Sequence, residues 1–272
     1  MPDLSLGRVA IGSVAGVDSA EVFLRLLFSL GAEAGAHALD GVSLAFPGPF
    51  DYTRGVSQME HKHPFLKGVD LRSPLAKHFD VAADDVTFVN DAAAYLMGEV
   101  GAGAARNVAH VVGLTLGTGI GSAFAVNEVV VSEGRGVPPG GEIWNLPYEG
   151  GIVEDAISTR AIQQNYRKLT GRTESVSHLA TLAASDRAAE AVFVQFGSAL
   201  GTMVRTLLAE FAPEAVVLGG GISRSSHLFL PAARAALSGM TVELRVAQLQ
   251  DNAPLAGAGA AWQAWHQTHP VA

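Results

Sequence analysis

The amino-acid sequence predicts a protein of the α/β class. Short apolar runs typical of strands are mixed with longer segments of helical periodicity along the chain. Two of the strand-like runs lead into glycine-rich turns, at residues 117–121 and 219–221. The length of 272 residues corresponds to one large domain or two modest ones, at roughly 150 residues per domain. This mixture of strands and helices is what an α/β architecture requires.

The first half of the chain is predicted to contain both kinds of element. Ser19 is expected to cap a helix, because its hydroxyl can accept a hydrogen bond from a free N–H group of the first turn. Two alternating apolar runs flank the glycines of residues 117–121 and predict a β-hairpin. The predicted strands are 8–14, 41–45, 86–89, 108–116 and 122–131, and the predicted helices are 19–35, 71–79 and 92–101.

The second half of the chain is predicted to be mostly helical. Residues 188–211 form its longest amphipathic segment, and residues 215–218 form a strand that runs directly into the glycines of 219–221. The predicted helices are 154–169, 177–184, 188–211, 226–237 and 253–265, and the predicted strands are 215–218 and 241–247.

Composition and charge exclude several classes of function. The absence of cysteine excludes disulfides, thiolate nucleophiles and metal sites with cysteine ligands. The formal net charge of −8 argues against binding to the phosphate backbone of nucleic acids. The longest uncharged run, residues 108–127, contains four glycines and therefore predicts two strands and a turn instead of a membrane helix. Because the N-terminus also lacks a signal peptide, we expect a cytoplasmic protein that binds neither nucleic acid nor membrane.

The glycine turn at residues 117–121 is the most informative segment. Its alternating glycines allow the backbone to approach a ligand and direct N–H groups toward an anion, and Thr118 can add a hydroxyl donor. Gly117 and Gly119 also match the start of a dinucleotide-binding fingerprint, but that motif requires a helix next, and residues 123–131 alternate as a strand. A phosphate-binding turn and a plain glycine hairpin both stay open at this point.

Asn90 and Asp91 follow the predicted buried strand 86–89 and precede a helix. The carboxyl ends of parallel strands are where α/β proteins place ligands. An aspartate there can act as a general base toward a hydroxyl group. Asp91 could equally serve as the N-cap of the helix that begins at Ala92.

The segment Gly219, Gly220 and Gly221 lies between a strand and a helix. Such a turn can accept a nucleotide against bare backbone, although by itself it could be only a tight connection.

Two further acidic positions, Glu142 and Glu154, lie in glycine-rich or polar surroundings. Carboxylates of this kind can hold sugar hydroxyls, although exposed carboxylates are usually only solvated.

In chain order, these segments resemble the ROK family of sugar kinases, members of the actin-like (hexokinase, ribonuclease H-like) ATPase fold. The resemblance covers nearly the whole chain from about Leu39. It implies a two-lobed α/β fold with a nucleotide and sugar cleft between the lobes. The small lobe would be residues 1–105, completed by a C-terminal helix of residues 253–272, and the large lobe residues 106–252. The matching motifs are residues 45–51, 89–94 with 98–99, 116–121, 141–143, 217–222 and 251–258.

The resemblance implies a glucokinase-like enzyme that phosphorylates a hexose or amino-hexose hydroxyl with ATP. Asp91 matches the general base that takes the proton of the sugar hydroxyl. Asn90, Glu142 and Glu154 match residues that bind other sugar hydroxyls.

The resemblance also implies ATP and Mg²⁺ as cofactors and a homodimeric assembly. Two turns match the family's nucleotide-binding segments. They are Gly117, Thr118 and Gly119, which match the second phosphate loop, and Gly219, Gly220 and Gly221, which match the segment facing adenosine.

One departure from the family concerns zinc. Most members carry a histidine after the Gly-Glu-Ile segment and a cysteine cluster that together hold a structural zinc. Here residues 144–148 occupy that place and cysteine is absent, so no structural zinc and no other protein metal site is expected. Asn145 lies in this replaced segment and is a candidate for the histidine's sugar contact.

A second departure concerns the first phosphate loop. Family members open with a β-hairpin that bears an Asp-x-Gly-Gly-Thr turn, and nothing before Arg8 resembles it. Either the start codon is assigned too late or the protein is truncated. We therefore expect low kinase activity from the 272-residue chain and recovery in an upstream-extended form. The alternative function is that of a catalytically weak, sugar-binding relative.

Overall fold

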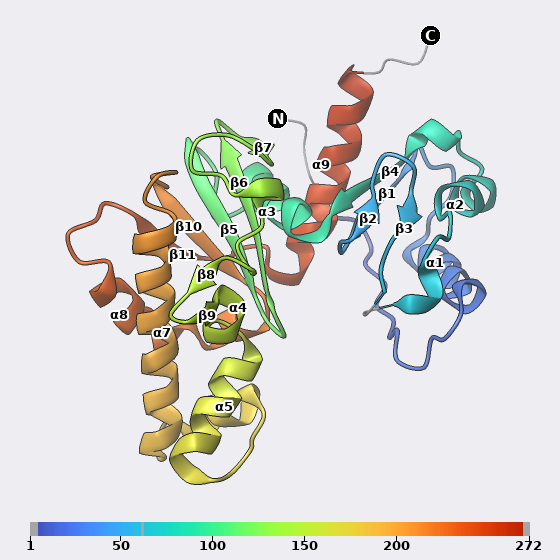
Figure 1. Cartoon of the computed structure of the whole chain (residues 1–272). Coiled ribbons are helices and arrows are strands. Elements are labelled where there is room, and N and C mark those ends of the chain that lie inside the picture. Colours follow the sequence, from blue (N-terminus) through green and yellow to red (C-terminus); the bar gives the residue numbers. More distant parts are fainter. Residues whose placement is uncertain (1–4, 61–62, 269–272) are drawn as a thin grey trace.

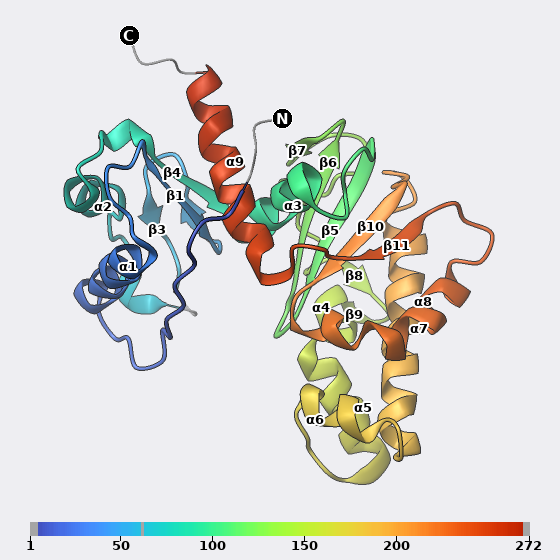
Figure 2. The same cartoon turned by 180° about the vertical axis from the view of Figure 1, so that it is seen from behind.

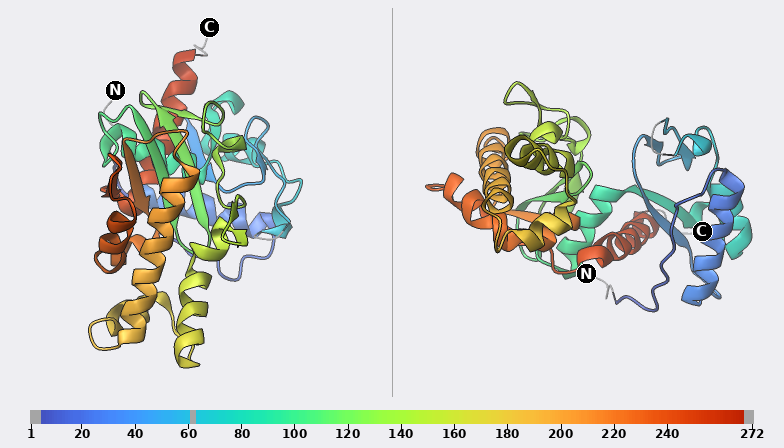
Figure 3. Two further views of the ribbon diagram at one scale, coloured as in Figure 1. Left: turned by 60° about the vertical axis from the view of Figure 1, so that its left-hand side comes forward. Right: turned by 90° about the horizontal axis from the view of Figure 1, so that it is seen from below.

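The computed structural model describes residues 5–60 and 63–268 and has the mixed α/β composition that the sequence predicts. Residues 1–4, 61, 62 and 269–272, which fall in the predicted small lobe and closing helix, lie outside the described residues. Figure 1 shows a smaller part built around β1 and β4 beside a larger part built around a five-stranded sheet. Helices α3 and α9 lie between these two parts, as the view from below in Figure 3 also shows.

The larger part is organised by a mixed sheet with the strand order β11-β10-β5-β6-β7. Strands β11, β10 and β5 are parallel, and β5, β6 and β7 are antiparallel. Side chains alternate between the two faces of a strand, so Val216 faces one hydrophobic cluster and its neighbour Val217 faces another. The strands are β5 (His110–Leu116), β6 (Ile120–Val126), β7 (Val129–Val131), β10 (Ala215–Gly219) and β11 (Glu243–Val246).

Helices cover both faces of this sheet (Figure 2). Apolar residues of α5, α7 and α8 pack on one face, and Tyr95, Leu96 and Val100 of α3 pack on the other. Among the helices in the described part of the chain, none is long and apolar enough to cross a membrane. The helices around this sheet are α3 (Asp91–Ala102), α4 (Val153–Ala156), α5 (Thr159–Thr170), α6 (Val176–Leu182), α7 (Arg187–Leu207) and α8 (Ser226–Ala236).

The smaller part contains a parallel pair of strands, β1 (Val42–Phe46) and β4 (Val86–Asn90). Phe46 is paired with Asn90, so both strands end at the same edge. Ser19 caps α1 as predicted, because its hydroxyl accepts a hydrogen bond from the Val22 N–H at 3.3 Å. Its helices are α1 (Ala20–Ala34) and α2 (Arg72–Phe79), and its short hairpin is β2 (Phe50–Asp51) with β3 (Val56–Ser57). A second short hairpin, β8 (Pro147–Tyr148) with β9 (Gly151–Ile152), lies in the larger part (Figure 1), where Tyr148 joins the core.

Five short 3-10 turns complete the described connections. They are Pro64–Leu66, Ala83–Asp85, Pro139–Gly141, Gly221–Ser225 and Gln250–Asn252.

The last helix, α9 (Ala253–Thr268), crosses α3 at very close range. A Cβ atom on Gly257 would overlap the carbonyl oxygen of Ala94, and one on Gly98 would overlap that of Ala253. Glu99, next to this crossing, is fully buried. Its carboxylate accepts hydrogen bonds from three backbone N–H groups, those of Ala104 (2.7 Å), Gln248 (3.1 Å) and Leu249 (2.8 Å). These charge-assisted bonds fasten the end of α3 to the segment that enters α9.

The predicted strand at residues 8–14 is wrong. The segment has no regular secondary structure, and Ile11 on it is 88% exposed. A strand requires a neighbour that pairs with its backbone, and within the described residues β1 pairs only with β4. Gly12 of this segment instead lies against Leu26 and Leu30 of α1.

Two other predicted elements are each divided by a short break. Residues 122–131 belong to β6 and β7, because Asn127 and Glu128 adopt positive φ angles and reverse the chain. Residues 154–169 belong to α4 and α5, because Ser158 is extended and its hydroxyl caps α5 by accepting from Ala161 N–H. The pattern of apolar residues continues across both breaks, so the sequence pattern does not show where the elements end.

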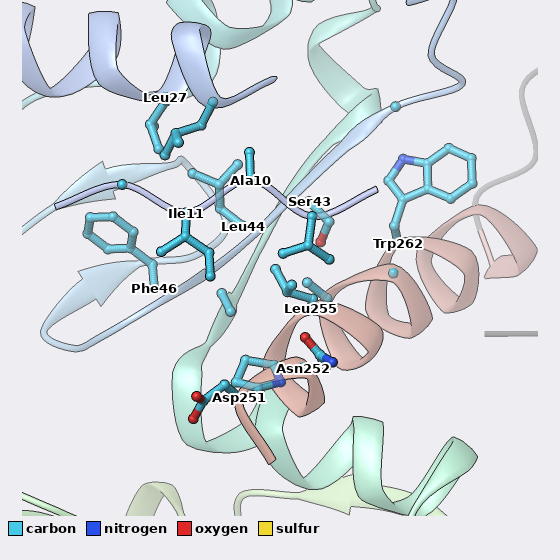
Figure 4. Close-up of a pocket in the computed structure, with 18 of the residues that line it drawn as sticks. Ala10, Ile11, Leu27, Ser43, Leu44, Phe46, Asp251, Asn252, Leu255 and Trp262 are labelled. Carbon is cyan, nitrogen blue, oxygen red and sulfur yellow. The ribbon is translucent and has the colours of Figure 1, made fainter. Parts of the chain in front are cut away.

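A groove of about 970 Å³ lies between residues 9–12, β1 and α9. In Figure 4, Ala10 and Ile11 line one side of it and Leu255 and Trp262 of α9 line another. Every candidate site residue falls outside its lining, so the groove is separate from the site described next.

Candidate functional site

Asn90 and Asp91 lie at the junction of β4 and α3. Asn90, not Asp91, is the N-cap of α3: its Oδ1 accepts hydrogen bonds from Ala92 N–H at 3.0 Å and Ala93 N–H at 3.1 Å. Asp91 is the first residue of the helix and is exposed, and its carboxylate accepts from Ala92 N–H at 2.9 Å. The capping role considered for Asp91 therefore belongs to its neighbour, which leaves the Asp91 carboxylate facing solvent.

The glycine turn at residues 117–119 connects β5 to β6, so a strand follows it, as predicted. Gly117 N–H donates to Gly119 O at 3.0 Å, and Gly117 O accepts from Thr159 N–H at 2.8 Å. Thr118 is exposed, and a Cβ atom on Gly117 would meet no atom within 4 Å. The turn thus presents open backbone and a hydroxyl at its tip.

The three glycines at 219–221 differ in their surroundings. Gly219 is buried against the ring of Tyr95, and Gly220 (φ +80°) lies against the backbone of Leu116. Of the three, Gly221 alone is exposed, and a Cβ atom added to it would meet no atom within 4 Å. Because Gly219 is paired with Thr115 of β5, this turn adjoins the turn at 117–119.

Glu142 is held in place through its backbone. The buried Ser122 hydroxyl donates to Gly141 O at 2.6 Å and accepts from Ile143 N–H at 3.0 Å, so it fixes the residues on both sides of Glu142. The Glu142 side chain is exposed and accepts a hydrogen bond from Trp144 Nε1 at 3.0 Å. Asn145 follows in the same loop and is also exposed.

Glu154 brings this loop and the glycine turn together. Its backbone N–H donates to Trp144 O at 3.0 Å, and its carboxylate accepts from Ile120 N–H at 3.3 Å. The same carboxylate occupies the space that a Cβ on Gly119 would need. Glu154 therefore lies beside the turn predicted to bind phosphate as well as beside the loop of Glu142.

Tyr52 connects the smaller part of the chain to these residues. Its hydroxyl donates to Phe46 O at 3.0 Å and accepts from Asn90 Nδ2 at 3.1 Å. Burial, partly offset by the hydrogen bond from Asn90 and reinforced by the charges of Asp91 and Glu142, raises the pKa of Tyr52 to about 12. Both carboxylates are therefore near enough to the Tyr52 hydroxyl to affect its ionisation.

Contacts at the start of α3 complete the arrangement. A Cβ atom on Gly121 would lie 3.3 Å from that of Ala92, so the residue after Asp91 adjoins the β5–β6 turn. The structure therefore groups Asn90, Asp91, Glu142, Glu154 and the turn at 117–121. The turn at 219–221 joins this group through the backbone of β5.

The sequence analysis missed Tyr52, Ser122 and Trp144. Ser122 carries a recognisable signal, since it is a polar residue within an apolar strand. Tyr52 follows a proline-rich turn and Trp144 follows Glu142, and neither position shows a periodicity that would single it out.

Buried tyrosines predict a loss of stability at high pH. Burial raises the pKa of both Tyr52 and Tyr148 to about 12, and burial also raises that of Tyr95. Tyrosines of the unfolded chain ionise near pH 10, so between about pH 10 and about pH 12 the folded state retains protons that the unfolded state loses. The free energy of unfolding should therefore fall across this interval.

Urea unfolding at about pH 9 and about pH 11 measures this fall in the free energy of unfolding. The Tyr52→Phe variant should lose less stability between these two pH values than the unaltered protein. Equal losses in both proteins would contradict this expectation.

The grouped residues can carry out proton transfer and anion binding. Asp91 is an accessible carboxylate that can accept a proton. The backbone at Gly117 and Gly221 is open toward a ligand, which suits phosphate and nucleotide binding. Within the described residues, no group of three His, Asp or Glu side chains could hold a metal ion.

Comparison with protein families gives a match to the ROK family over residues 27–265. The chain is 31% identical over 210 residues to a glucokinase of Thermotoga maritima, with 69% of this chain and 65% of that protein covered. It is 25% identical over 187 residues to an N-acetyl-D-glucosamine kinase of Pectobacterium carotovorum, with 61% and 60% covered. The chain thus spans less than two thirds of the length of these two relatives.

Solved structures show the same fold. A ROK hexokinase from Thermus thermophilus has a TM-score of 0.71 and 29% identity, with 89% of this chain and 85% of that chain covered. A ROK family glucokinase from Streptomyces griseus, in complex with glucose and AMPPNP, has a TM-score of 0.73 and 22% identity, with 90% and 88% covered.

Proposed function

Because this chain belongs to the ROK family and has its actin-like ATPase fold, we propose that it transfers a phosphoryl group from ATP to a hydroxyl of a hexose or amino-hexose. The observation that supports this function most strongly is the position of Asp91. It is an exposed carboxylate at the carboxyl end of β4, and its neighbour Ala92 adjoins the glycine turn at 117–121. A general base and a phosphate-binding turn must be this close for phosphoryl transfer.

In the proposed reaction, Asp91 accepts the proton of the sugar hydroxyl. The hydroxyl oxygen forms a bond to the γ-phosphorus of ATP, the bond between that phosphorus and the β,γ-bridging oxygen breaks, and ADP leaves. Asn90, Glu142, Glu154 and Asn145 orient the sugar through its other hydroxyls. Most of the protein's contribution is then the placement of reactants, which is the main source of rate in this chemistry.

The nucleotide is proposed to lie across the two glycine turns. Gly117, Thr118 and Gly119 would bind its phosphates, and Gly221 would face adenosine, with Gly219 and Gly220 fixing its position by their packing. Mg²⁺ bound with the nucleotide would spread the charge of the transferred phosphoryl group. Within the described residues no cluster of acidic or histidine side chains could hold the ion, so it would be bound mainly by the nucleotide phosphates and water, and Asp91 stays available as the base.

The proposed sugar class is supported by two relatives, a glucokinase and an N-acetyl-D-glucosamine kinase. We expect the protein to convert D-glucose or N-acetyl-D-glucosamine, with ATP and Mg²⁺, to a sugar phosphate and an equal amount of ADP. Mass spectrometry of the product and an assay for ADP release measure this. Sugar binding in calorimetry without any ADP release would instead support the weakly catalytic, sugar-binding alternative. If the protein neither binds nor phosphorylates these sugars, both the kinase function and the sugar-binding alternative are rejected.

A further inference from the structure

Tyr52 determines which end of the Asn90 amide faces it. The Tyr52 hydroxyl donates its only hydrogen to Phe46 O at 3.0 Å. A carbonyl oxygen can only accept, so toward Asn90 the tyrosine oxygen can itself only accept. The group that meets it at 3.1 Å is Asn90 Nδ2, which is the end of the amide that can donate. An amide turned the other way would place two acceptors against each other.

The other end of the amide is occupied as well. Asn90 Oδ1 accepts from the N–H groups of Ala92 and Ala93, at 3.0 and 3.1 Å. A carbonyl oxygen has two lone pairs, and both are engaged. Nδ2 has two hydrogens, and Tyr52 accepts one of them. Among the described residues nothing accepts its second hydrogen, so the Asn90 side chain is left with a single N–H donor of fixed direction.

The position of the tyrosine hydroxyl is itself fixed by aromatic packing. The ring of Tyr52 lies 5.2 Å from that of Phe50, which in turn lies 4.9 Å from Phe46 and 5.1 Å from Phe88. Phe46, Phe50 and Phe88 are all buried in the core of the smaller part. The hydroxyl thus projects from a packed cluster to the end of β4.

We infer that Tyr52 is a positioning residue for the sugar, because it directs the one remaining N–H of Asn90 to a sugar hydroxyl that accepts it. This inference rests on the proposed function, in which Asn90 binds sugar next to the base Asp91. Tyr52 need not touch the substrate. It sets the direction of a donor, and so it contributes to discrimination at one hydroxyl of the sugar.

The test is the Tyr52→Phe variant, which keeps the ring in its aromatic cluster and removes only the hydroxyl. We expect KM for D-glucose to rise about fivefold to tenfold, as for the loss of one hydrogen bond, with kcat and KM for ATP within about twofold. The decisive readout uses monodeoxy analogues of D-glucose. The unaltered protein should bind one analogue markedly more weakly than glucose, and Tyr52→Phe should lose most of that difference at this position alone.

A matched control is Tyr166→Phe. The Tyr166 hydroxyl also makes a side-chain hydrogen bond, to Asp186 at 2.9 Å, but it lies between α5 and α7 and not among the candidate site residues. This variant should be less stable without any change in KM or in discrimination among analogues. If both variants raise KM alike, or if Tyr52→Phe keeps the full discrimination, the positioning role is rejected while the kinase assignment stands. If the unaltered protein neither binds nor phosphorylates D-glucose or N-acetyl-D-glucosamine, the inference and the proposed function fall together.

Discussion

Replacement of Asp91 by Asn is expected to lower kcat for sugar phosphorylation by about 10²–10⁴-fold, the contribution typical of a general base. Asparagine has the same shape, and its carbonyl oxygen can accept the hydrogen bond that Ala92 N–H donates to Asp91 at 2.9 Å. What it cannot do is accept the proton of the sugar hydroxyl. KM for the sugar should therefore change by no more than about threefold, so the loss should appear almost entirely in kcat.

The structure also predicts that this variant folds normally. Asn90, whose Oδ1 accepts from Ala92 and Ala93, caps α3, so the substitution leaves the cap intact. Asp91 is exposed and at the N-terminus of the helix, where the loss of one negative charge costs about 0.3–1 kcal/mol. The loss of activity can thus be separated from a loss of structure by a thermal melt.

A suitable control is Asp84→Asn, which removes an exposed carboxylate from the turn Ala83–Asp85, before β4 and outside the site. Initial rates of ADP release with saturating sugar give kcat for both variants. Asp84→Asn should match the unaltered protein. Should Asp91→Asn retain more than about a tenth of kcat, the assignment of Asp91 as general base would be wrong.

Most helices and strands could be predicted because their side-chain periodicity is local. Residues 86–89 are all β-branched or aromatic, which is typical of a strand, and they form β4 with one added residue. The predictions fail where the structure depends on a residue that is distant in the sequence or on a single capping residue. Residues 8–14 have strand-like composition but meet no pairing strand in the described part of the chain, and the Ser158 cap divides one apolar helical pattern into two helices.

In the candidate site, too, the residues with local sequence signals could be predicted, and those that depend on distant contacts could not. Motifs identify Asn90, Asp91 and the glycine turns, because glycine and capping residues have strong local preferences. The sequence does not reveal that the Glu154 carboxylate lies against Gly119. The two residues are far apart in the chain, and they meet because α4, which carries Glu154, lies beside the β5–β6 turn. The same holds for Tyr52, in the turn after β2, whose partner Asn90 lies at the end of β4.

The crossing of α3 and α9 carries the largest expected effect on stability. Gly257 on α9 lies so close to Ala94 that an added Cβ would overlap the Ala94 carbonyl oxygen, and Gly98 on α3 is similarly pressed against Ala253. Backbone atoms cannot rotate away as a side chain can. An added methyl group must therefore push the two helices apart.

We expect Gly257→Ala to destabilise the protein by about 3 kcal/mol, the upper part of the usual range for overpacking. The melting temperature should fall by about 6–12 °C for a chain of this size. Gly259→Ala is a close control, since it lies on the same helix and its added Cβ would meet no atom within 4 Å. Alanine is the better helix former by about 1 kcal/mol, so this control should be unchanged or slightly more stable.

The two substitutions add the same methyl group to one helix, so their difference isolates the contact with α3. That contact also affects the site, because α3 begins at Asp91 and its far end is fastened by Glu99 to the segment before α9. A displaced α3 would move Asp91 relative to the turn at 117–121, which its neighbour Ala92 adjoins. Gly257→Ala should consequently lower kcat at temperatures where the protein is still folded, whereas Gly259→Ala should not. Thermal melts and initial rates on both variants measure these effects, and equal melting temperatures would show that the helices are not in the close contact described.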